Sequence, residues 1–124
     1  MSDEAPKIRQ ARLTEDEGCA LLKVRFNEAG FKIQERFVFE EVGVSVELDG
    51  FDPAARVGYE YLTTEEGDRI EFTPSVVAAL EGLMEKGQLF LLMIDERDVD
   101  AKGLSLAAER FLTYVKKVQA EQPS

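Results

Sequence analysis

Apolar residues recur at helical spacing in three stretches of the chain, and the first stretch lies near the N-terminus. Leu22 and Phe26 fall on one face of a helix that we expect over residues 14–30. Thr14, followed three residues later by Glu17, has the pattern of a capping box, in which each side chain bonds the other residue's backbone N–H. The first helix therefore has a defined start as well as an apolar face.

Two later helices are predicted by the same reasoning. Thr73 and Pro74 begin a helix over residues 74–86, because a proline at the first helical position lacks only an N–H that would have no partner there. A last helix starts at Leu104, where apolar residues again repeat at helical spacing, and fades at Gln119. Each of these helices presents an apolar stripe that must be covered by the rest of the fold.

Polar and apolar residues alternate with a period of two between the first two helices. This alternation predicts strands over residues 33–39 and 44–48, which form a hairpin, and a third strand over residues 57–63. Ile70 and Phe72 can add a short further strand. The segment is therefore expected to form a three-stranded meander.

The run Leu89–Ile94 is apolar at every position. A strand without alternation needs cover on both faces, so we expect it in the interior of the sheet with helices on its faces. The resulting order, α-β-β-β-α-β-α, predicts a single α/β (α+β) domain with a mixed four-stranded sheet. The domain would span residues 14–118, between a flexible N-terminal arm at 1–13 and a C-terminal tail at 119–124.

The apolar stripes of these elements predict a set of largely buried residues. They are Leu22, Phe26, Phe37, Val46, Leu48, Val77, Leu80, Leu92, Phe111 and Leu112. If several of them were exposed, the register assumed for the helices and strands would be wrong.

Composition narrows the chemistry that these 124 residues can carry. The chain has no His, which removes His bases and nearly every Cys/His metal site. Its one cysteine, Cys19, excludes an internal disulfide and is expected to be a small core residue. No apolar run approaches the roughly 20 residues of a membrane helix, and no basic-then-apolar leader is present. We therefore expect a cytoplasmic protein whose chemistry rests on carboxylates.

The chain is strongly acidic, with 25 Asp and Glu against 15 Lys and Arg and a net charge of −10. Residues 31–72 contribute −7 of this charge. Such a field repels phosphate backbones, so nucleic-acid binding is disfavoured and a protein partner is expected instead. The alternative is that the acids only keep a small domain soluble.

Two acids stand eleven residues apart on neighbouring predicted strands. Asp49 ends the segment Val46–Asp49, and Glu60 lies within the segment Val57–Leu62. Phe26–Ile33 joins the end of the first helix to the first strand through a glycine and an aromatic residue. These motifs and the element order resemble the core of the PD-(D/E)XK nuclease superfamily.

The resemblance covers residues 14–95 and implies the restriction-endonuclease-like fold. In that family the second strand carries an acid, and the third strand carries an acid, one spacer and a lysine. Asp49 and Glu60 take the two acid positions, whereas Leu62 stands where the lysine is expected. The resemblance therefore implies the carboxylates of a nuclease site without its lysine.

Carboxylates from adjacent strands can hold a hard cation such as Mg²⁺, which neutralises a phosphate and activates water. The resemblance implies Asp49 and Glu60 as the ligands of such a metal. Glu47 shares a strand face with Asp49 and can be a third ligand, and Glu17 of the first helix can supply a fourth, as in some family members. No other cofactor is indicated.

Leucine cannot position or deprotonate the attacking water, because that task needs a cationic or basic nitrogen. Lys23, Lys32 or Lys86 would have to reach the site from another element. Without such a replacement, no catalytic residue is assigned.

Each acid also has a purely structural interpretation. Glu47 and Asp49 can form the solvent face of a half-buried strand. Glu60 can face solvent or pair with Arg56 or Arg69. None of these alternatives needs a metal, and the sequence leaves them open.

The sequence favours a non-catalytic acidic binding or structural protein on a nuclease-like scaffold. It also resembles type III secretion chaperones, which work as dimers and hold an unfolded stretch of a partner protein. A third hypothesis is an immunity-type or DNA-mimic protein whose acidic face blocks a basic partner. An active metal-dependent nuclease with a migrated lysine is the enzymatic alternative, and homodimer formation stays open.

Overall fold

The computed structural model describes residues 13–63 and 71–121. The described elements follow the predicted order α-β-β-β-α-β-α, with one short 3₁₀ turn before the last helix. They are α2 (Glu15–Glu28), β1 (Gln34–Glu41), β2 (Val44–Asp52), β3 (Val57–Leu62), α4 (Pro74–Glu85), β4 (Phe90–Asp95), η1 (Glu96–Asp98) and α5 (Ala101–Glu121). One mixed four-stranded sheet with helices packed on it confirms the expected fold class.

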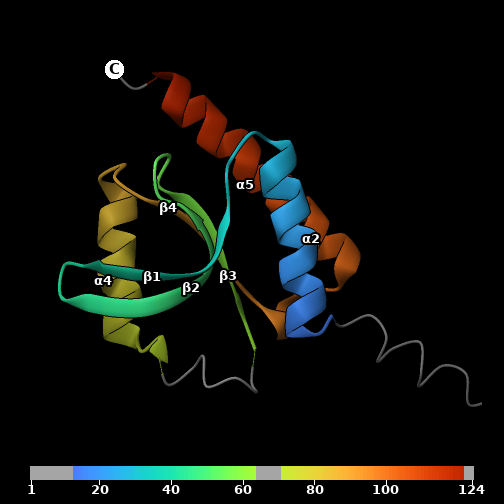
Figure 1. The fold of residues 1–124 in the computed structure, drawn as a ribbon, viewed down its shortest axis with the longest axis horizontal. Helices are drawn as coiled ribbons and strands as arrows, with labels where there is room; N and C mark the ends of the chain where they lie inside the picture. Colours follow the sequence, from blue (N-terminus) through green and yellow to red (C-terminus); the bar gives the residue numbers. More distant parts are fainter. Residues whose placement is uncertain (1–12, 64–70, 122–124) are drawn as a thin grey trace, which may run out of the picture.

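The four strands lie in the order β1-β2-β3-β4 (Figure 1). β1, β2 and β3 form an antiparallel meander, and β4 runs parallel to β3. The parallel register pairs Val57 with Phe90 and Tyr61 with Ile94. Parallel neighbours cannot be joined by a tight turn, so the crossover through α4 is what makes this pairing possible.

The expectation that Leu89–Ile94 would form an interior strand is wrong, because β4 stands at the edge of the sheet. Among the strands that the structure describes, β4 pairs with β3 alone. Leu89 and Leu91 pack into one apolar cluster with α4, whereas Phe90 packs into the other cluster with α2 and α5. Helices thus cover both faces of β4, as expected, and this cover alone accounts for its unbroken apolar sequence.

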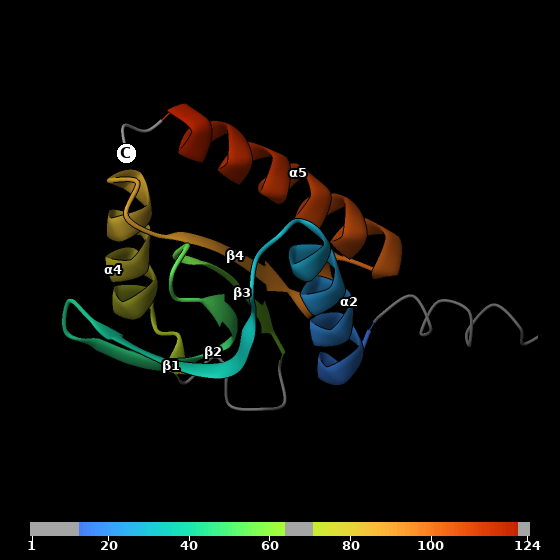
Figure 2. The same cartoon turned by 45° about the horizontal axis from the view of Figure 1, so that its top comes forward.

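The sheet separates the two apolar clusters. α4 lies on one side of it, and α2 and α5 lie together on the other side (Figures 1 and 2). On the α2 and α5 side, Phe26 packs edge-on against Tyr59, with their ring centroids 5.0 Å apart. On the α4 side, Phe39 meets Phe51 in a similar edge-on contact at 5.8 Å. Aromatic pairs of this kind anchor the strands on both faces.

None of the residues expected to be largely buried is exposed, so the assumed register is confirmed. Six of them are buried and four are partly buried. The buried residues are Leu22, Phe26, Val46, Leu48, Leu80 and Leu112, and the partly buried ones are Phe37, Val77, Leu92 and Phe111.

The last helix is longer than its apolar spacing indicated. α5 begins at Ala101 instead of Leu104 and continues to Glu121, beyond the expected end of the globular domain. Its early start has a local cause, because the Asp100 carboxylate accepts a hydrogen bond from Gly103 N at 2.7 Å. A side chain that caps the first turn in this way stabilises helix upstream of the first apolar position.

Parts of three sequence-based expectations lie outside the described residues. These parts are residues 1–12 of the arm, residues 122–124 of the tail, and Ile70 of the short further strand. The partner of Ile70 in that strand, Phe72, is buried in a bend. Leu13, assigned to the arm, belongs to the packed domain, because its carbonyl accepts a hydrogen bond of 2.9 Å from a tyrosine hydroxyl of β3.

Candidate functional site

The ladder between β2 and β3 ends at the pair Gly50 and Tyr59. One position further along, two carboxylates replace the missing backbone acceptors. Asp49 N donates to Glu60 Oε1 at 2.8 Å, and Tyr61 N donates to Asp49 Oδ2 at 2.8 Å. These side-chain acceptors take the place of backbone carbonyls, so the two acids hold the strands together where regular pairing stops.

The loss of regular strand pairing at Asp49 also affects Glu47 on the same strand and Arg36 on β1. Glu47 N donates to a third carboxylate, Glu71 Oε2, at 3.0 Å. On β1, Arg36 lies opposite Asp49 between two regular pairs and has a φ of 55°, in the left-handed region that a residue with a side chain seldom adopts. The sheet is therefore irregular at one level across three strands.

A cleft of about 700 Å³ lies at this level, between the start of α2 and the irregular part of the sheet. We call it the acidic cleft. Its lining residues are Glu15, Asp16, Cys19, Ala20, Glu35, Arg36, Glu47, Asp49 and Glu71. Six of these carry a carboxylate and one carries a guanidinium, so the cleft is strongly negative.

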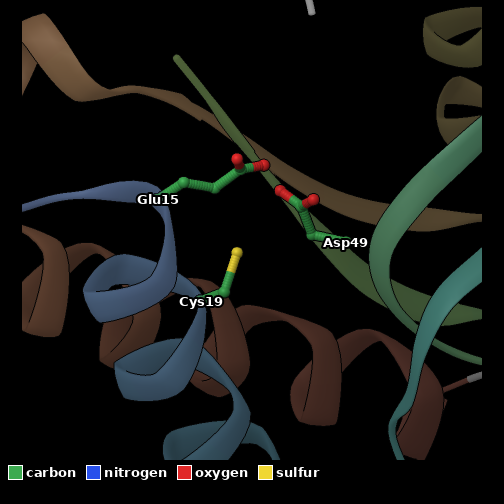
Figure 3. Close-up of side chains that lie close together, drawn as sticks. All are labelled: Glu15, Cys19 and Asp49. Atoms are coloured by element: carbon green, nitrogen blue, oxygen red, sulfur yellow. The ribbon is translucent and has the colours of Figure 1, made fainter. Parts of the chain in front are cut away.

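Three side chains in the acidic cleft face one another, as Figure 3 shows. Glu15 and Cys19 extend from α2, and Asp49 extends toward them from β2. One carboxylate oxygen of Glu15, the Cys19 Sγ and one carboxylate oxygen of Asp49 all lie within 4.8 Å of one another. Their spacing and chemistry would allow them to share a cation.

Cys19 lies at the border between the cleft and the core. Its side chain is partly buried and packs against the α2 and α5 cluster, which agrees with the expected role as a core residue. Burial raises the pKa of the thiol far above its ordinary value, and the charge of Asp49, a hydrogen bond to Asp49 and the charge of Glu15 raise it further. The thiol is therefore protonated at neutral pH and donates to Asp49.

Tyr59 lies behind the wall of the cleft. Its side chain is fully buried, and its hydroxyl has no hydrogen-bond partner in the described part of the chain. The ring crosses over Gly50, where a Cβ would stand 2.5 Å from the hydroxyl oxygen. Burial raises the pKa of Tyr59, and so do the nearby Cys19, Glu35 and Asp49, all of which line the cleft.

The four candidate metal ligands lie in different surroundings. Asp49 and Glu60 are neighbours joined by the hydrogen bond described above, but Glu60 is only 1% exposed and does not line the cleft. Glu47 is exposed on the cleft wall, which fits its alternative as part of a solvent face. Glu17 closes the capping box, accepting from Thr14 N at 2.9 Å, and stands outside the cleft.

The sequence offers two arginines, Arg56 and Arg69, as ion-pair partners of Glu60. Arg56 forms a two-pronged ion pair with Glu41, with contacts of 2.7 and 2.8 Å, and so is engaged elsewhere. Arg69 lies outside the described residues. One partner of Glu60 is the backbone of β2, through Asp49 N. The spacing of acids in the sequence carries no signal for such a bond.

The position at which the nuclease-like motif expects a lysine carries an apolar side chain. Leu62 packs against the α4-side cluster. Lys23 reaches the rim of the cleft through an ion pair of 3.3 Å with Glu35, whereas Lys32 and Lys86 do not line it. Arg36 is the one basic residue among the described residues of the lining. Arginine stays protonated in proteins and cannot serve as a general base.

Sequence reasoning missed Glu15, Cys19 and Glu71 as members of the site. The spacing of four residues between Glu15 and Cys19 places them on one helical face and could have indicated the pair. Glu71 has no such signal, because it reaches β2 from a distant segment.

No family model, curated protein or solved structure matches this chain. None of the described helices is long and apolar enough to cross a membrane. The function must therefore be inferred from the geometry of the cleft.

Proposed function

We propose that this protein is a non-catalytic binding protein on a nuclease-like scaffold, and that the acidic cleft receives a basic segment of a protein partner. The observation that carries the proposal is the charge of the cleft, where six carboxylates surround Arg36. A concave surface lined by one sign of charge focuses the electric field and attracts groups of opposite sign. Lysine or arginine side chains of a partner would supply that charge.

The arrangement of the acids speaks against phosphate chemistry. Asp49 and Glu60 accept backbone hydrogen bonds between β2 and β3, so removing either would take the acceptor from a partly buried backbone N–H. The position that the motif gives to lysine is Leu62, which is partly buried against the α4-side cluster. The carboxylates that the nuclease-like motif supplies thus have a structural use here.

The nuclease-like scaffold itself is part of the proposal. Its support is the antiparallel meander followed by a parallel β4, together with two acids at the point where β2 and β3 separate. A cytoplasmic location belongs to the same proposal, because Cys19 is a free thiol and the reducing cytoplasm preserves free thiols.

The chaperone-like alternative would need a large apolar face on which two copies could meet. The large apolar side chains that are exposed in the described residues are spread over α2, β1, the hairpin turn and α5. They are Val24, Val38, Val42, Leu106 and Tyr114. This distribution gives the chaperone-like alternative less support than the cleft gives a charged partner.

Fluorescence anisotropy with a labelled oligo-arginine peptide tests the proposal. We expect saturable binding that weakens about tenfold in the double variant Glu35→Gln and Glu47→Gln, because both carboxylates line the cleft. An oligo-glutamate peptide of the same length should not bind.

The matched control removes two acids from the far side of the sheet. Glu81→Gln with Glu85→Gln on α4 changes the net charge equally, and both residues are exposed outside the cleft. The control should bind nearly as well as the wild type. Equal losses in the two double variants would mean that only net charge matters, and the proposed role of the cleft would be wrong.

A further inference from the structure

We propose that Glu15, Cys19 and Asp49 form a site for one thiophilic divalent cation, such as Zn²⁺, Co²⁺ or Cd²⁺. The site is on the α2 wall of the acidic cleft (Figure 3). It shares Glu15 and Asp49 with the acidic cleft, but it goes beyond the proposed recognition of a basic partner, because it also uses the Cys19 sulfur and has its own readout.

The donor set selects the class of metal. One sulfur and two carboxylate oxygens suit a borderline or soft cation, whereas Mg²⁺ and Ca²⁺ take oxygen ligands. In a tetrahedral zinc site, donor atoms stand about 3.6 Å apart, given metal distances of about 2.3 Å to sulfur and 2.0–2.2 Å to oxygen. The three donors lie within 4.8 Å of one another, so modest side-chain rotations would close the site.

A second observation points to a ligand at the same place. The buried hydroxyl of Tyr59 has no partner among the described residues, and a buried polar group without a partner costs free energy. A Cβ on Gly50, the residue next to Asp49, would stand 2.5 Å from this hydroxyl, which places the hydroxyl beside the Asp49 corner of the cluster. A cation, or a water bound to it, would give the hydroxyl a partner.

Loading the site is an exchange of a proton for a metal ion. Without metal, the Cys19 thiol donates its hydrogen to Asp49. On loading, the S–H bond breaks, the sulfur keeps the electron pair and bonds the cation, and the proton passes to solvent. Asp49 turns one oxygen from the thiol to the cation, and no oxidation or reduction takes place.

Ultraviolet absorption during Cd²⁺ titration tests the site directly. Cys19 is the one cysteine of the chain, so a thiolate-to-cadmium charge-transfer band can arise only from it. We expect this band to saturate at one equivalent and a large excess of Mg²⁺ to leave it unchanged. No band, or a band that grows without saturating, would overturn the proposal.

Variants of Glu15 establish whether its carboxylate belongs to the metal site. Glu15→Gln should weaken Cd²⁺ binding about tenfold or more, whereas Glu47→Gln on another part of the cleft wall should change it less than about twofold. Tyr59→Phe should weaken Cd²⁺ binding but keep the thiolate-to-cadmium band, because Cys19 is still present. Circular dichroism checks that this variant is folded. If Glu15→Gln binds Cd²⁺ as well as the wild type, the cation contacts the thiol alone and the three-residue site is wrong.

Discussion

Gly50 is the residue on which packing behind the acidic cleft depends most directly. Its α-carbon lies under the Tyr59 ring, and a Cβ at this position would meet the ring carbons and, at 2.5 Å, the hydroxyl oxygen. The neighbouring Gly58 has a comparable contact, because a Cβ there would collide with the Gly50 carbonyl. The two strands approach closely at this point only because both residues lack a side chain.

Gly50→Ala should therefore lower the free energy of unfolding by about 2 kcal/mol, since Tyr59 is fully buried and cannot move aside without disturbing Phe26. Urea denaturation measures the change. Gly82→Ala in α4 is the matched control, because the added Cβ would meet no side chain or other element within 4 Å and alanine favours a helix over glycine by about 0.8–1.0 kcal/mol. A Gly50→Ala protein as stable as wild type would contradict the described packing.

Among the elements, the β1–β2 hairpin has an unusual turn. Val42 and Gly43 are the two central residues, and both have positive φ, at 49° and 78°. Two-residue turns with this geometry favour Asn-Gly, because a β-branched residue is strained in the left-handed region. Val42 is also 58% exposed, so no burial compensates for the strain.

Val42→Asn should consequently raise the free energy of unfolding by about 0.5–1 kcal/mol. The same substitution at Val38 is the control, because Val38 is 57% exposed in regular β1 and valine suits a strand better than asparagine. Thermal denaturation should show opposite shifts for the two variants. A lower stability of Val42→Asn would mean that Val42 makes contacts that its exposure does not reveal.

An ion pair fastens the same hairpin to the rest of the sheet. Arg56, between β2 and β3, bonds Glu41 at the end of β1 through two nitrogens and also donates from Nε to Gln88 O at 2.6 Å. These hydrogen bonds lower the pKa of Glu41, chiefly through Arg56. The pair thus joins β1 to the loop that precedes β4.

The pH dependence of this pair follows from the direction of the shift. Because the folded-state pKa of Glu41 lies below its ordinary value of about 4.3, the pair stabilises the fold above that pH and loses its effect as the pH falls through the lowered pKa. A double-mutant cycle of Glu41→Gln and Arg56→Gln should give a coupling of about 0.5 kcal/mol at neutral pH, because both side chains are more than a third exposed. The coupling should fall as the pH drops below the ordinary pKa of Glu41 and vanish once Glu41 is fully protonated, so a coupling that does not change on acidification would contradict the assignment.

The elements were largely predictable from the sequence, because each has its own local signal. Capping residues and apolar spacing located the helices, and alternation located β1, β2 and β3. The position of β4 was not predictable in this way, because cover by α4 on one face and by α5 on the other leaves the same apolar pattern as an interior strand. A local pattern of apolar residues indicates how far a strand is buried, but it does not indicate which strands lie beside it in the sheet.

The site was predictable only in part, for a related reason. The nuclease-like motif set Asp49 and Glu60 on neighbouring strands, and in the structure the Asp49 N–H bonds the Glu60 carboxylate. It did not anticipate that regular pairing stops there, that Arg36 adopts a positive φ, or that the acids bond backbone N–H groups. Such irregularities arise from tertiary packing, which a period of two cannot encode.

At the scale of the whole molecule, charge decides which partners can approach. The net charge of −10 is concentrated in the strands that a nuclease-like site would use, and the acidic cleft opens on the same strands. Under the proposed function, a phosphate backbone would meet repulsion before it reached Asp49, whereas a basic protein segment would be attracted.

We accordingly expect no cleavage of single- or double-stranded DNA by the wild-type protein with Mg²⁺ or Mn²⁺ at neutral pH. Chemistry is disfavoured because Leu62 stands where the nuclease-like motif has its lysine and because Glu60 accepts a hydrogen bond from the backbone of β2. Binding of DNA is disfavoured by the negative field of the protein. Labelled plasmid and oligonucleotides, incubated with wild type, Leu62→Lys and Glu60→Gln, provide the measurement. Leu62→Lys should yield at most traces of product, because a lysine restores one group and leaves the repulsive surface intact. Cleavage by the wild type that disappears in a folded Glu60→Gln variant would mean that another group replaces the lysine and that the protein is an enzyme.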